Sequence, residues 1–339
     1  MEQDFIVYET LEAELVKSNG KTVLESLEDG SSFVFIKTIG QGAFSKVKHA
    51  ERQWKNENGE LLKADYAVKI MHKGILKKQR CVIYNRENVM KMTNNWEKIE
   101  SEIDIWRRLS NENVIRLYEI INAKNLENLY LIIEYADCGQ IMKWNSNEQK
   151  YDLNTLIVSH VKSKHPEIFT RYSEREAIGK VIFKQVCEGL EFLHRKFIVH
   201  KDLKPDNILF CSEKVLFKLT DFTISEQLEG PEALCYNPPG TTPFQAPESM
   251  LSGVGFVGEK SDIWALGICI YSFMNNGQLP FWEPESEIFT QMAIQNNPVN
   301  YPNEFSENLK SILTGILNKD PVQRFSLQQI LSHPWLVNN

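Results

Sequence analysis

The chain has 339 residues, and 42% of them are hydrophobic, which is enough to build the cores of two domains of roughly 100–200 residues each. Acidic residues outnumber basic ones, 45 to 38, and the net charge of −7 argues against nucleic acid as a partner. The longest apolar run, residues 263–274, is too short to cross a bilayer, and the chain starts with acidic residues, so we expect neither a membrane span nor a targeting peptide.

The N-terminal stretch carries a hairpin signal. Residues 11–16 and 22–27 are separated by Asn19-Gly20, a pair that favours the tight turn between two antiparallel strands. We therefore expect an N-terminal extension, residues 1–30, that contains this hairpin and precedes the main fold.

A strand with alternating apolar residues, Phe33 and Phe35, leads into a turn with two glycines. The turn consists of Ile39, Gly40, Gln41, Gly42, Ala43, Phe44, Ser45, Lys46 and Val47. Because glycine has no Cβ, the main-chain N–H groups of such a turn can approach phosphate oxygens closely. An ordinary hairpin turn would show the same pattern. The turn alone therefore does not distinguish a phosphate-binding loop from a hairpin, and the segments that follow are needed to do so.

Two strands and a helix come next in the chain. The strand Tyr66-Ala67-Val68-Lys69-Ile70 places one lysine among apolar residues. Residues 96–109 have the spacing of an amphipathic helix with Glu102 beside its apolar face, and residues 129–136 form an apolar strand that runs into a polar link. A lysine in a strand is usually an edge charge and a helical carboxylate is usually solvated, so neither is informative alone.

The run Val199-His200-Lys201-Asp202-Leu203-Lys204-Pro205-Asp206-Asn207 places a carboxylate, an ammonium group and an amide on one short loop. Asp202 could accept a proton from a hydroxyl group, Lys204 could stabilise a phosphoryl group, and Asn207 could hold a divalent cation. These groups suit phosphoryl transfer, in which the protein supplies position and charge rather than covalent chemistry.

This loop resembles the H-R-D-L-x-x-x-N catalytic loop of protein kinases, with Lys201 in the place of arginine. The earlier turn and lysine strand resemble the glycine-rich loop and the V-A-I-K strand of that family. Leu219-Thr220-Asp221-Phe222-Thr223 and Ala246-Pro247-Glu248 resemble its D-F-G and A-P-E motifs. The sequence is therefore identified as a member of the protein kinase family, and Lys204, two residues after Asp202, indicates the serine/threonine type.

The resemblance implies an α+β fold, the bilobal protein kinase fold. Residues 31–135 would form the N-lobe, a five-stranded antiparallel sheet with one helix, and residues 136–337 would form a mainly α-helical C-lobe. The resemblance also implies ATP and Mg²⁺ as cofactors and a protein serine or threonine as the acceptor of the γ-phosphate.

The resemblance assigns roles to single residues. ATP would contact the glycine-rich turn and Ala67, Lys69, Glu102, Glu134, Ala136 and Leu209. Glu102 would hold Lys69 against the phosphates, and Asn207 and Asp221 would bind the metal ion. The structural residues would be Thr241, which ties Asp202 to Lys204, Asp262, which accepts N–H bonds from the catalytic loop, and the ion pair of Glu248 with Arg324.

Three positions depart from the family pattern. Ser45 replaces the third glycine of the turn, Lys201 replaces arginine, and Thr223 replaces the glycine of D-F-G. If the backbone at Thr223 required a positive φ, a β-branched residue there would cost about 1–3 kcal/mol. The departures leave an alternative open, a pseudokinase that binds nucleotide as a scaffold without catalysis. We favour the active enzyme, because the lysine, the metal ligands and the catalytic aspartate are retained.

Other segments are similar to calcium/calmodulin-dependent protein kinase kinases. They include Val7-Tyr8-Glu9-Thr10, Gly139-Gln140-Ile141-Met142 and Glu232-Ala233-Leu234. This resemblance implies that the protein substrate is another kinase. Members of that family carry a calmodulin-binding helix after the kinase domain, and residues 333–339 are not followed by one. We therefore expect either no calmodulin control or a regulatory segment beyond Asn339.

The activation segment lacks a familiar phosphorylation site. Many kinases are switched on by a phosphothreonine bound by the arginine before the catalytic aspartate. Asn237 stands at the threonine position, and Lys201 lacks the planar fork that suits a phosphate. We expect activity that does not depend on phosphorylation of this segment.

Two polar insertions interrupt the family pattern. Residues 73–95 contain a basic run that favours a solvated face and leaves a docking role open, and residues 145–170 are expected to form a surface loop.

Gln140 and Ser272 are neutral where arginine-selecting kinases have carboxylates, so only Asp206 remains to attract a basic side chain. Six scattered cysteines favour a reducing compartment, the cytoplasm or the nucleus.

Overall fold

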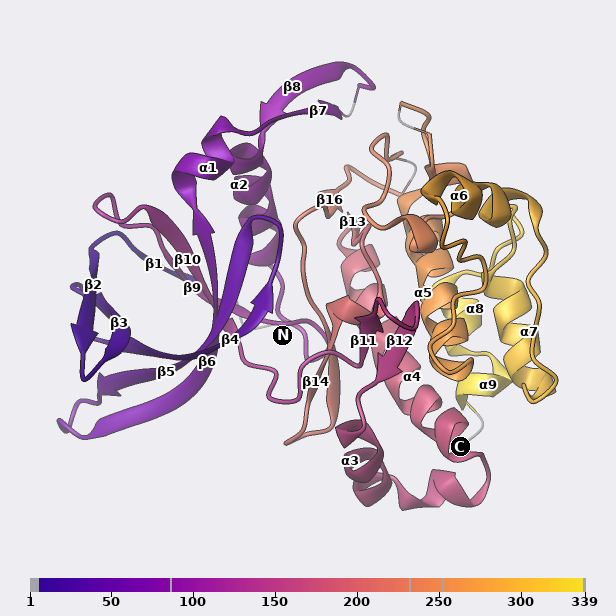
Figure 1. The fold of residues 1–339 in the computed structure, drawn as a ribbon, viewed down its shortest axis with the longest axis horizontal. Helices are drawn as coiled ribbons and strands as arrows, with labels where there is room; N and C mark the ends of the chain where they lie inside the picture. Colours follow the sequence, from indigo (N-terminus) through magenta and orange to yellow (C-terminus); the bar gives the residue numbers. More distant parts are fainter. Residues whose placement is uncertain (1–5, 86, 232, 252, 338–339) are drawn as a thin grey trace. The chain divides into compact units, whose positions relative to one another are not determined.

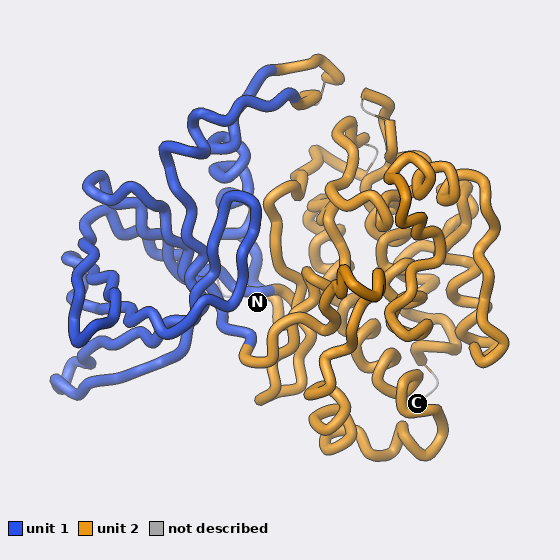
Figure 2. The backbone as a smooth tube through the Cα atoms, viewed as in Figure 1, with its two compact units in different colours: residues 1–82, 92–110, 115–136 blue, residues 83–91, 111–114, 137–339 orange. Residues whose placement is uncertain are grey.

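The computed structural model of the chain describes residues 6–85, 87–231, 233–251 and 253–337. The chain divides into two compact units, shown in two colours in Figure 2. Unit 1 comprises residues 1–82, 92–110 and 115–136, and unit 2 comprises residues 83–91, 111–114 and 137–339. The N-terminal extension belongs to unit 1 and is described from Ile6, so its first five residues lie outside the described part.

Unit 1 is built on an eight-stranded sheet (Figure 1). From edge to edge its strands are β1 (Tyr8–Thr10), β9 (Leu117–Ile121), β10 (Asn128–Glu134), β6 (Leu61–His72), β5 (Ser45–Lys55), β4 (Ser32–Gln41), β3 (Lys21–Ser26) and β2 (Ala13–Ser18). Neighbouring strands are antiparallel, except that β1 runs parallel to β9. In β10 the run from Leu129 to Ile133 is buried without interruption, as its apolar sequence requires for a strand covered on both faces.

The sheet has three more strands than the five we expected, and all three come from the N-terminal extension. Asn19 and Gly20 both have positive φ, 50° and 76°, and form the turn between β2 and β3. β3 then pairs with β4, while β1 pairs with β9 at the opposite edge. The sequence pattern does not reveal this pairing, because the main-chain N–H and C=O groups of an edge strand accept a partner largely regardless of its side chains.

The long helix of unit 1, α2 (Asn95–Trp106), follows the short helix α1 (Lys73–Lys78). The side chain of Asn94 caps α2 by accepting the Glu97 N–H at 3.0 Å. The helix ends three residues before the predicted Leu109, because the last turn tightens and the Leu109 N–H bonds to the Trp106 carbonyl. Between α1 and α2 lie the paired strands β7 (Arg80–Tyr84) and β8 (Met90–Asn94).

Unit 2 is mainly helical (Figure 1). Its helices are α3 (Leu156–Lys164), α4 (Glu174–Arg195), α5 (Gly258–Met274), α6 (Glu287–Asn296), α7 (Glu307–Ile316), α8 (Leu327–Leu331) and α9 (Pro334–Val337). Three strand pairs accompany them: β11 (Met142–Asn145) with β12 (Lys150–Leu153), β13 (Ile198–Val199) with β16 (Glu226–Gln227), and β14 (Ile208–Cys211) with β15 (Leu216–Leu219). The core helix is α5, whose residues from Ser261 to Phe273 are all buried.

The segment 145–170 is not the surface loop that we expected. It contains the end of β11, β12 and the nine-residue helix α3. Ile157 and Val161 of α3 are fully buried, and their spacing of four residues places them on one face of the helix. Two apolar anchors among polar residues were too weak a periodic signal to identify the helix from sequence.

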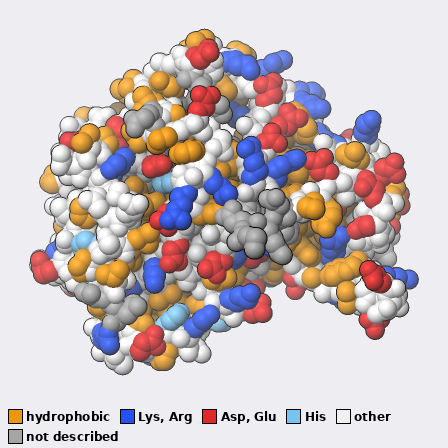
Figure 3. Space-filling model, turned by 180° about the vertical axis from the view of Figure 1, so that it is seen from behind, with side chains coloured by type: hydrophobic (Ala, Val, Ile, Leu, Met, Phe, Trp, Pro, Cys, Tyr) orange, Lys and Arg blue, Asp and Glu red, His pale blue; other side chains and the backbone are white. Residues whose placement is uncertain are grey.

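In the described part of the chain no helix has the length and apolar character needed to span a membrane. On the face drawn in Figure 3, lysine and arginine side chains are interspersed with aspartate and glutamate side chains.

Candidate active site

The loop that carries Asp202 lies between β13 and β14, and Asp262 of α5 holds its backbone. Asp262 accepts the main-chain N–H of His200 at Oδ2 and that of Lys201 at Oδ1, both at 2.8 Å. Lys201 has a φ of +66°, a left-handed conformation that disfavours a residue with a side chain. Two bonds to a buried carboxylate stabilise this conformation, and so determine the direction in which the loop continues to Asp202.

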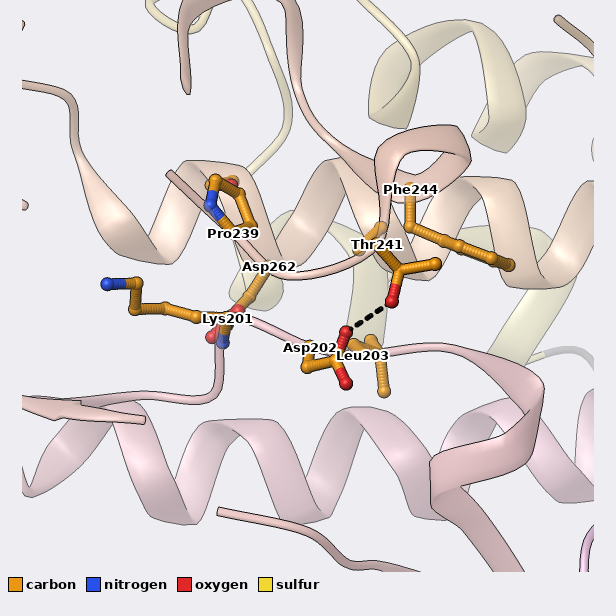
Figure 4. Close-up of a pocket in the computed structure, with 9 residues that line it drawn as sticks. Lys201, Asp202, Leu203, Pro239, Thr241, Phe244 and Asp262 are labelled. Atoms are coloured by element: carbon orange, nitrogen blue, oxygen red, sulfur yellow. Dashed lines mark hydrogen bonds between the residues drawn. The ribbon is translucent and has the colours of Figure 1, made fainter. Parts of the chain in front are cut away.

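Asp202, Lys204 and Thr241 form a triangle of polar contacts. Lys204 Nζ donates to Asp202 Oδ2 at 2.7 Å and to Thr241 Oγ1 at 2.8 Å. The Thr241 hydroxyl donates its proton to Asp202 Oδ1 at 2.7 Å (Figure 4). The hydroxyl thus accepts from the ammonium group and donates to the carboxylate, which fixes both charged groups around it. The tie that we expected Thr241 to make is present.

A small pocket lies beside this triangle (Figure 4). It is lined by Lys201, Asp202, Leu203, Pro239, Thr241, Phe244, Ser261, Asp262 and Ala265. Its volume is about 10 Å³, which admits about one water molecule. The pocket is a packing gap next to α5 and is far too small for a nucleotide.

Asn207 and Asp221 lie close together in the fold, since both flank the β14–β15 hairpin. The Asn207 carbonyl accepts the N–H of Thr220, the neighbour of Asp221, at 3.0 Å. The Asn207 side-chain amide donates to the Asp202 carbonyl at 2.8 Å and to Asp202 Oδ2 at 3.1 Å. Its Nδ2 is therefore committed to Asp202, and its Oδ1 is the atom it can offer to a cation. An amide oxygen and a carboxylate are hard ligands that suit a divalent ion such as Mg²⁺.

The strain considered for Thr223 is absent. Thr223 does not have a positive φ in the structure, whereas Asp221 does, at 65°. The Thr223 hydroxyl donates to Asp221 Oδ1 at 2.5 Å. Threonine at this position thus adds a hydrogen bond that glycine could not make, and this bond helps to orient the Asp221 carboxylate.

Lys69 of β6 and Glu102 of α2 form a buried ion pair in unit 1. Lys69 Nζ lies 2.6 Å from Glu102 Oε1, and the two side chains are 10% and 0% exposed. The ammonium group also lies 5.8 Å from the centre of the Trp106 ring, on the same helix. Both charges lose hydration on burial, and their mutual attraction offsets part of that cost. The pair holds the lysine ammonium at a defined place on the sheet.

The glycine-containing turn joins β4 to β5. The Gly42 N–H bonds to the Ser45 carbonyl at 2.8 Å, and Gly40 lies opposite Val47. A Cβ on Gly42 would lie only 2.9 Å from Ser45 Oγ, so a larger residue would displace that hydroxyl. The serine that departs from the family pattern therefore lies next to Gly42 and takes its N–H, while residues 41–44 of the turn remain exposed.

The remaining predicted nucleotide contacts are distributed over the two units. In unit 1, Ala67 is buried in β6, Glu134 ends β10 with its N–H bonded to the Arg116 carbonyl at 2.9 Å, and Ala136 is the last residue. In unit 2, Leu209 lies in β14 opposite Lys218 and is partly buried. Their contacts with a nucleotide remain predictions.

Asp206 is less available to a substrate than we expected. The Tyr151 hydroxyl donates to Asp206 Oδ2 at 2.8 Å. Burial raises the pKa of the Asp206 carboxyl above its ordinary value, although this hydrogen bond opposes the shift. A partly desolvated carboxylate that already has a partner attracts a basic side chain only weakly.

Glu248 and Arg324 form the expected ion pair in unit 2. Arg324 Nη1 and Nη2 donate to the two oxygens of Glu248 at 2.6 and 2.9 Å, and the arginine side chain is 0% exposed. The guanidinium also donates to the Lys260 and Asn318 carbonyls. All the hydrogen-bonding directions of this fork are therefore directed at acceptors, which makes the pair a structural clamp at the end of the activation segment.

Comparison with known proteins decides the family. The protein kinase domain model matches residues 33–336. The chain belongs to the protein kinase family. The α+β bilobal fold expected from the sequence is thereby confirmed. Kinases of this family use ATP with a divalent metal ion and act on protein substrates, so both belong to the chemistry of this domain.

The relatives of this kinase are serine/threonine kinases. It is 31% identical over 336 residues to a calcium/calmodulin-dependent protein kinase kinase of Caenorhabditis elegans, which covers 96% of this chain and 56% of that protein. It is 30% identical to serine/threonine-protein kinase stk11 of Xenopus laevis, over 88% of this chain and 59% of that protein. Serine/threonine-protein kinase GRIK1 of Arabidopsis thaliana is 29% identical over 95% of this chain and 72% of its own length. The chain spans little more than half the length of the first two.

Two features of the kinase domain were missed by the reasoning from sequence. Lys201 Nζ lies 2.9 Å from Glu226 Oε2, and its side chain is only 4% exposed. The side chain of Asn237 contacts the main chain of Tyr84, 153 residues away. The replacement of arginine by Lys201 was visible, but neither partner could be identified, because no motif spacing links them.

Proposed function

We propose that this kinase transfers the γ-phosphate of MgATP to a serine or threonine hydroxyl of another protein. The observation that carries the proposal is the triangle of Asp202, Lys204 and Thr241. Asp202 would orient the acceptor hydroxyl and take its proton, an effect worth about 10²–10⁴-fold. Lys204, held 2.7 Å from that carboxylate, would offset negative charge on the phosphoryl group during transfer.

The phosphates of ATP would be positioned by the remaining charged groups. Lys69, held by Glu102, would pair with the α- and β-phosphates, and the glycine-containing turn would cover them. We propose Mg²⁺ as the divalent ion, with Asn207 and Asp221 as its protein ligands. When bound, Mg²⁺ shields the charge of the phosphate oxygens.

We further propose that the substrate is the activation segment of another kinase. The C. elegans relative is named as a kinase of a protein kinase, which supports this role. Ser272 is completely buried, and Asp206 is bound by Tyr151, so neither is suited to select an arginine upstream of the target residue. A substrate recognised through its fold rather than through basic residues is consistent with these observations.

The catalytic proposal is tested by substituting the proposed base. Asp202→Asn should lower MgATP phosphotransfer at least about 100-fold, because the amide cannot take the hydroxyl proton. Binding of a fluorescent ATP analogue should be retained in this variant. Asp152→Asn, which changes an exposed aspartate of β12, is the matched control and should keep the wild-type rate. Wild-type protein that binds nucleotide but transfers no phosphate would favour the pseudokinase alternative.

The substrate proposal is tested separately. Transfer to an intact, inactive kinase domain is compared with transfer to an array of peptides that carry arginine at each position before the target. We expect the folded kinase domain to be the better substrate, with little effect of arginine in the peptides. Strong dependence on an upstream arginine would contradict the proposal.

A further inference from the structure

The insertion hairpin, which we define as residues 83–91 at the tip of β7 and β8, belongs to unit 2 (Figure 2). Its turn is held by Asn85, whose main-chain N–H bonds to the Val89 carbonyl at 3.0 Å and whose Oδ1 accepts the Val89 N–H at 2.8 Å. The hairpin is therefore a formed structure that presents its main chain at a defined place.

The side chain of Asn237 pairs with the main chain of this hairpin. Asn237 Oδ1 accepts the Tyr84 N–H at 2.8 Å, and Asn237 Nδ2 donates to the Tyr84 carbonyl at 2.8 Å. A side-chain amide offers one acceptor and donors in the geometry of a peptide group, so it can satisfy both groups of one residue at once. Alanine and aspartate cannot make both bonds. Asn237 stands where many kinases carry the phosphorylated threonine of the activation segment.

A second set of contacts supports the same attachment. Asn88 Nδ2 donates to the Gly253 carbonyl at 3.1 Å. A Cβ on Gly253 would lie 3.0 Å from the ring of Tyr84, so the ring packs directly on that glycine. The Gly253 N–H in turn bonds to the Tyr236 carbonyl at 3.0 Å, next to Asn237. The hairpin thus holds the activation segment at Asn237 and also the chain at Gly253, just after that segment, and these two stretches are bonded to each other.

The chain just after Asn237 reaches the catalytic loop. Gly240 donates its N–H to the Lys201 carbonyl at 3.3 Å, and Thr241 donates its hydroxyl to Asp202 at 2.7 Å. A Cβ on Gly240 would lie 3.0 Å from Asp202 Oδ1, which shows how close the segment runs to the carboxylate. Only two residues, Pro238 and Pro239, separate Asn237 from Gly240, so a displacement of Asn237 would be transmitted to Thr241.

Lys201 stands where a phosphate on the activation segment would find its cation, and it already forms an ion pair. Lys201 Nζ lies 2.9 Å from Glu226 Oε2 and is buried. A phosphate near Lys201 would have to compete with this carboxylate and would repel it. The activation segment is therefore held by neutral hydrogen bonds to the insertion hairpin and by an internal ion pair.

We propose that the insertion hairpin takes the place of an activating phosphate, and that Asn237 is a positioning residue that keeps Thr241 on Asp202. The inference rests on the proposed phosphotransfer function and adds the means by which the activation segment is held. Loss of the Asn237 amide would loosen the segment on which the protein substrate docks, and would leave the Lys69–Glu102 pair unchanged.

The test compares Asn237→Ala and Asn237→Asp with Asn88→Ala and with Asn147→Ala, an exposed asparagine in the β11–β12 turn that serves as control. We expect both Asn237 variants to lower kcat/KM for the protein substrate roughly 10-fold to 100-fold, equivalent to about 1.4–2.8 kcal/mol. The KM for ATP should stay within about twofold of the wild-type value. General unfolding would impair both substrates, so a loss confined to the protein substrate would exclude it. Asn88→Ala should have a smaller effect, about threefold, because it removes one hydrogen bond at the edge of the contact. Asn147→Ala should have none.

Hydrogen–deuterium exchange of the Tyr84 amide provides a readout that does not depend on activity. We expect slow exchange in the wild type and faster exchange in Asn237→Ala, since this substitution removes the acceptor of that N–H. Unchanged exchange would overturn the contact itself. Faster exchange with unchanged kcat/KM would overturn the positioning role. A wild-type protein that transfers no phosphate would overturn the proposed function and the positioning role together, and the exchange measurement would still decide whether the hairpin holds the segment.

Discussion

The Thr241 hydroxyl is a single group that connects the two charged side chains of the catalytic loop. It donates to Asp202 and accepts from Lys204. Thr241→Val keeps the shape of the side chain and removes both bonds. We expect kcat to fall roughly 10-fold to 100-fold, since two hydrogen bonds to charged groups that orient the base are lost. Steady-state kinetics measures the effect.

The control for this substitution is Thr241→Ser, which keeps the hydroxyl and should retain most of the activity. Equal rates for Thr241→Val and the wild type would show that the ion pair of Asp202 and Lys204 keeps its orientation without the hydroxyl.

The Lys69–Glu102 pair is a second case in which one partner depends on the other. Glu102→Gln would leave a buried ammonium group beside a neutral amide. We expect the free energy of unfolding to fall by about 1.5–3 kcal/mol and the KM for ATP to rise. Chemical denaturation and kinetics check the two effects. The control is Glu100→Gln, at an exposed position of the same helix, which should change neither the stability nor the KM for ATP. If Glu102→Gln lost stability without a rise in KM, the proposed role of the pair would be contradicted.

At the scale of residues, the motif positions could be placed from the sequence because phosphoryl transfer restricts their chemical types and spacing. Asp202, Lys204 and Thr241 meet as expected, and so do Lys69 and Glu102. The consequence of Thr223 could not be predicted, because it depends on which residue carries the positive φ.

At the scale of elements, Arg324 links the segment before α8 to the chain around Glu248 and to the start of α5. Arg324→Ala would leave the Glu248 carboxylate without its partner and three carbonyls without a donor. We expect the free energy of unfolding to fall by about 3–5 kcal/mol. Chemical denaturation measures the change. Arg324→Lys should lose less stability than Arg324→Ala, because it keeps the charge, although it loses the bidentate geometry. Equal losses for the two variants would show that the charge alone contributes nothing there.

The sheet carries a buried carboxyl group in β9. Glu119 accepts the Thr10 hydroxyl at 2.6 Å, and burial raises the pKa of Glu119 above its ordinary value. A raised pKa means that the folded state favours the protonated form. Stability from this group is therefore complete below the ordinary pKa of the carboxyl and is lost as the pH rises through the folded-state pKa.

We accordingly expect Glu119→Gln to stabilise the protein at neutral pH and to flatten the dependence of the unfolding free energy on pH across this window. Denaturation in urea at several pH values measures the unfolding free energy of both proteins and its dependence on pH. A variant that is less stable than the wild type at neutral pH would show that the nearby Arg52, 3.7 Å from Glu119, outweighs the cost of burial.

Elements with strong local signals were predictable. The Asn19-Gly20 turn, the amphipathic helix α2 and the apolar strand β10 all follow from residues within a few positions. The helix α3 and the parallel pairing of β1 were not, since their stability comes from contacts with segments far away in the chain.

At the scale of the whole molecule, the replacement of the phosphate-binding arginine by Lys201 predicts activity that does not depend on phosphorylation of the activation segment. Lys201 is paired with Glu226, and Asn237 is bonded to Tyr84. Treatment of the purified kinase with a phosphatase should therefore leave its rate unchanged within about twofold, because the activation segment is held without phosphate. Mass spectrometry of the treated protein serves as the control for complete dephosphorylation. A large drop in rate would contradict the prediction.

The N-terminal strands have a practical consequence for any shortened version of this protein. A fragment that starts at residue 33, where the family match begins, would lack β1, β2 and β3. β9 and β4 would then become outer strands with bare main-chain groups, and Phe33 would lose the cover of Leu24. Such strands pair readily with those of a neighbouring copy. A trimmed recombinant fragment would consequently tend to self-associate and precipitate, although every motif of the reaction would still be present.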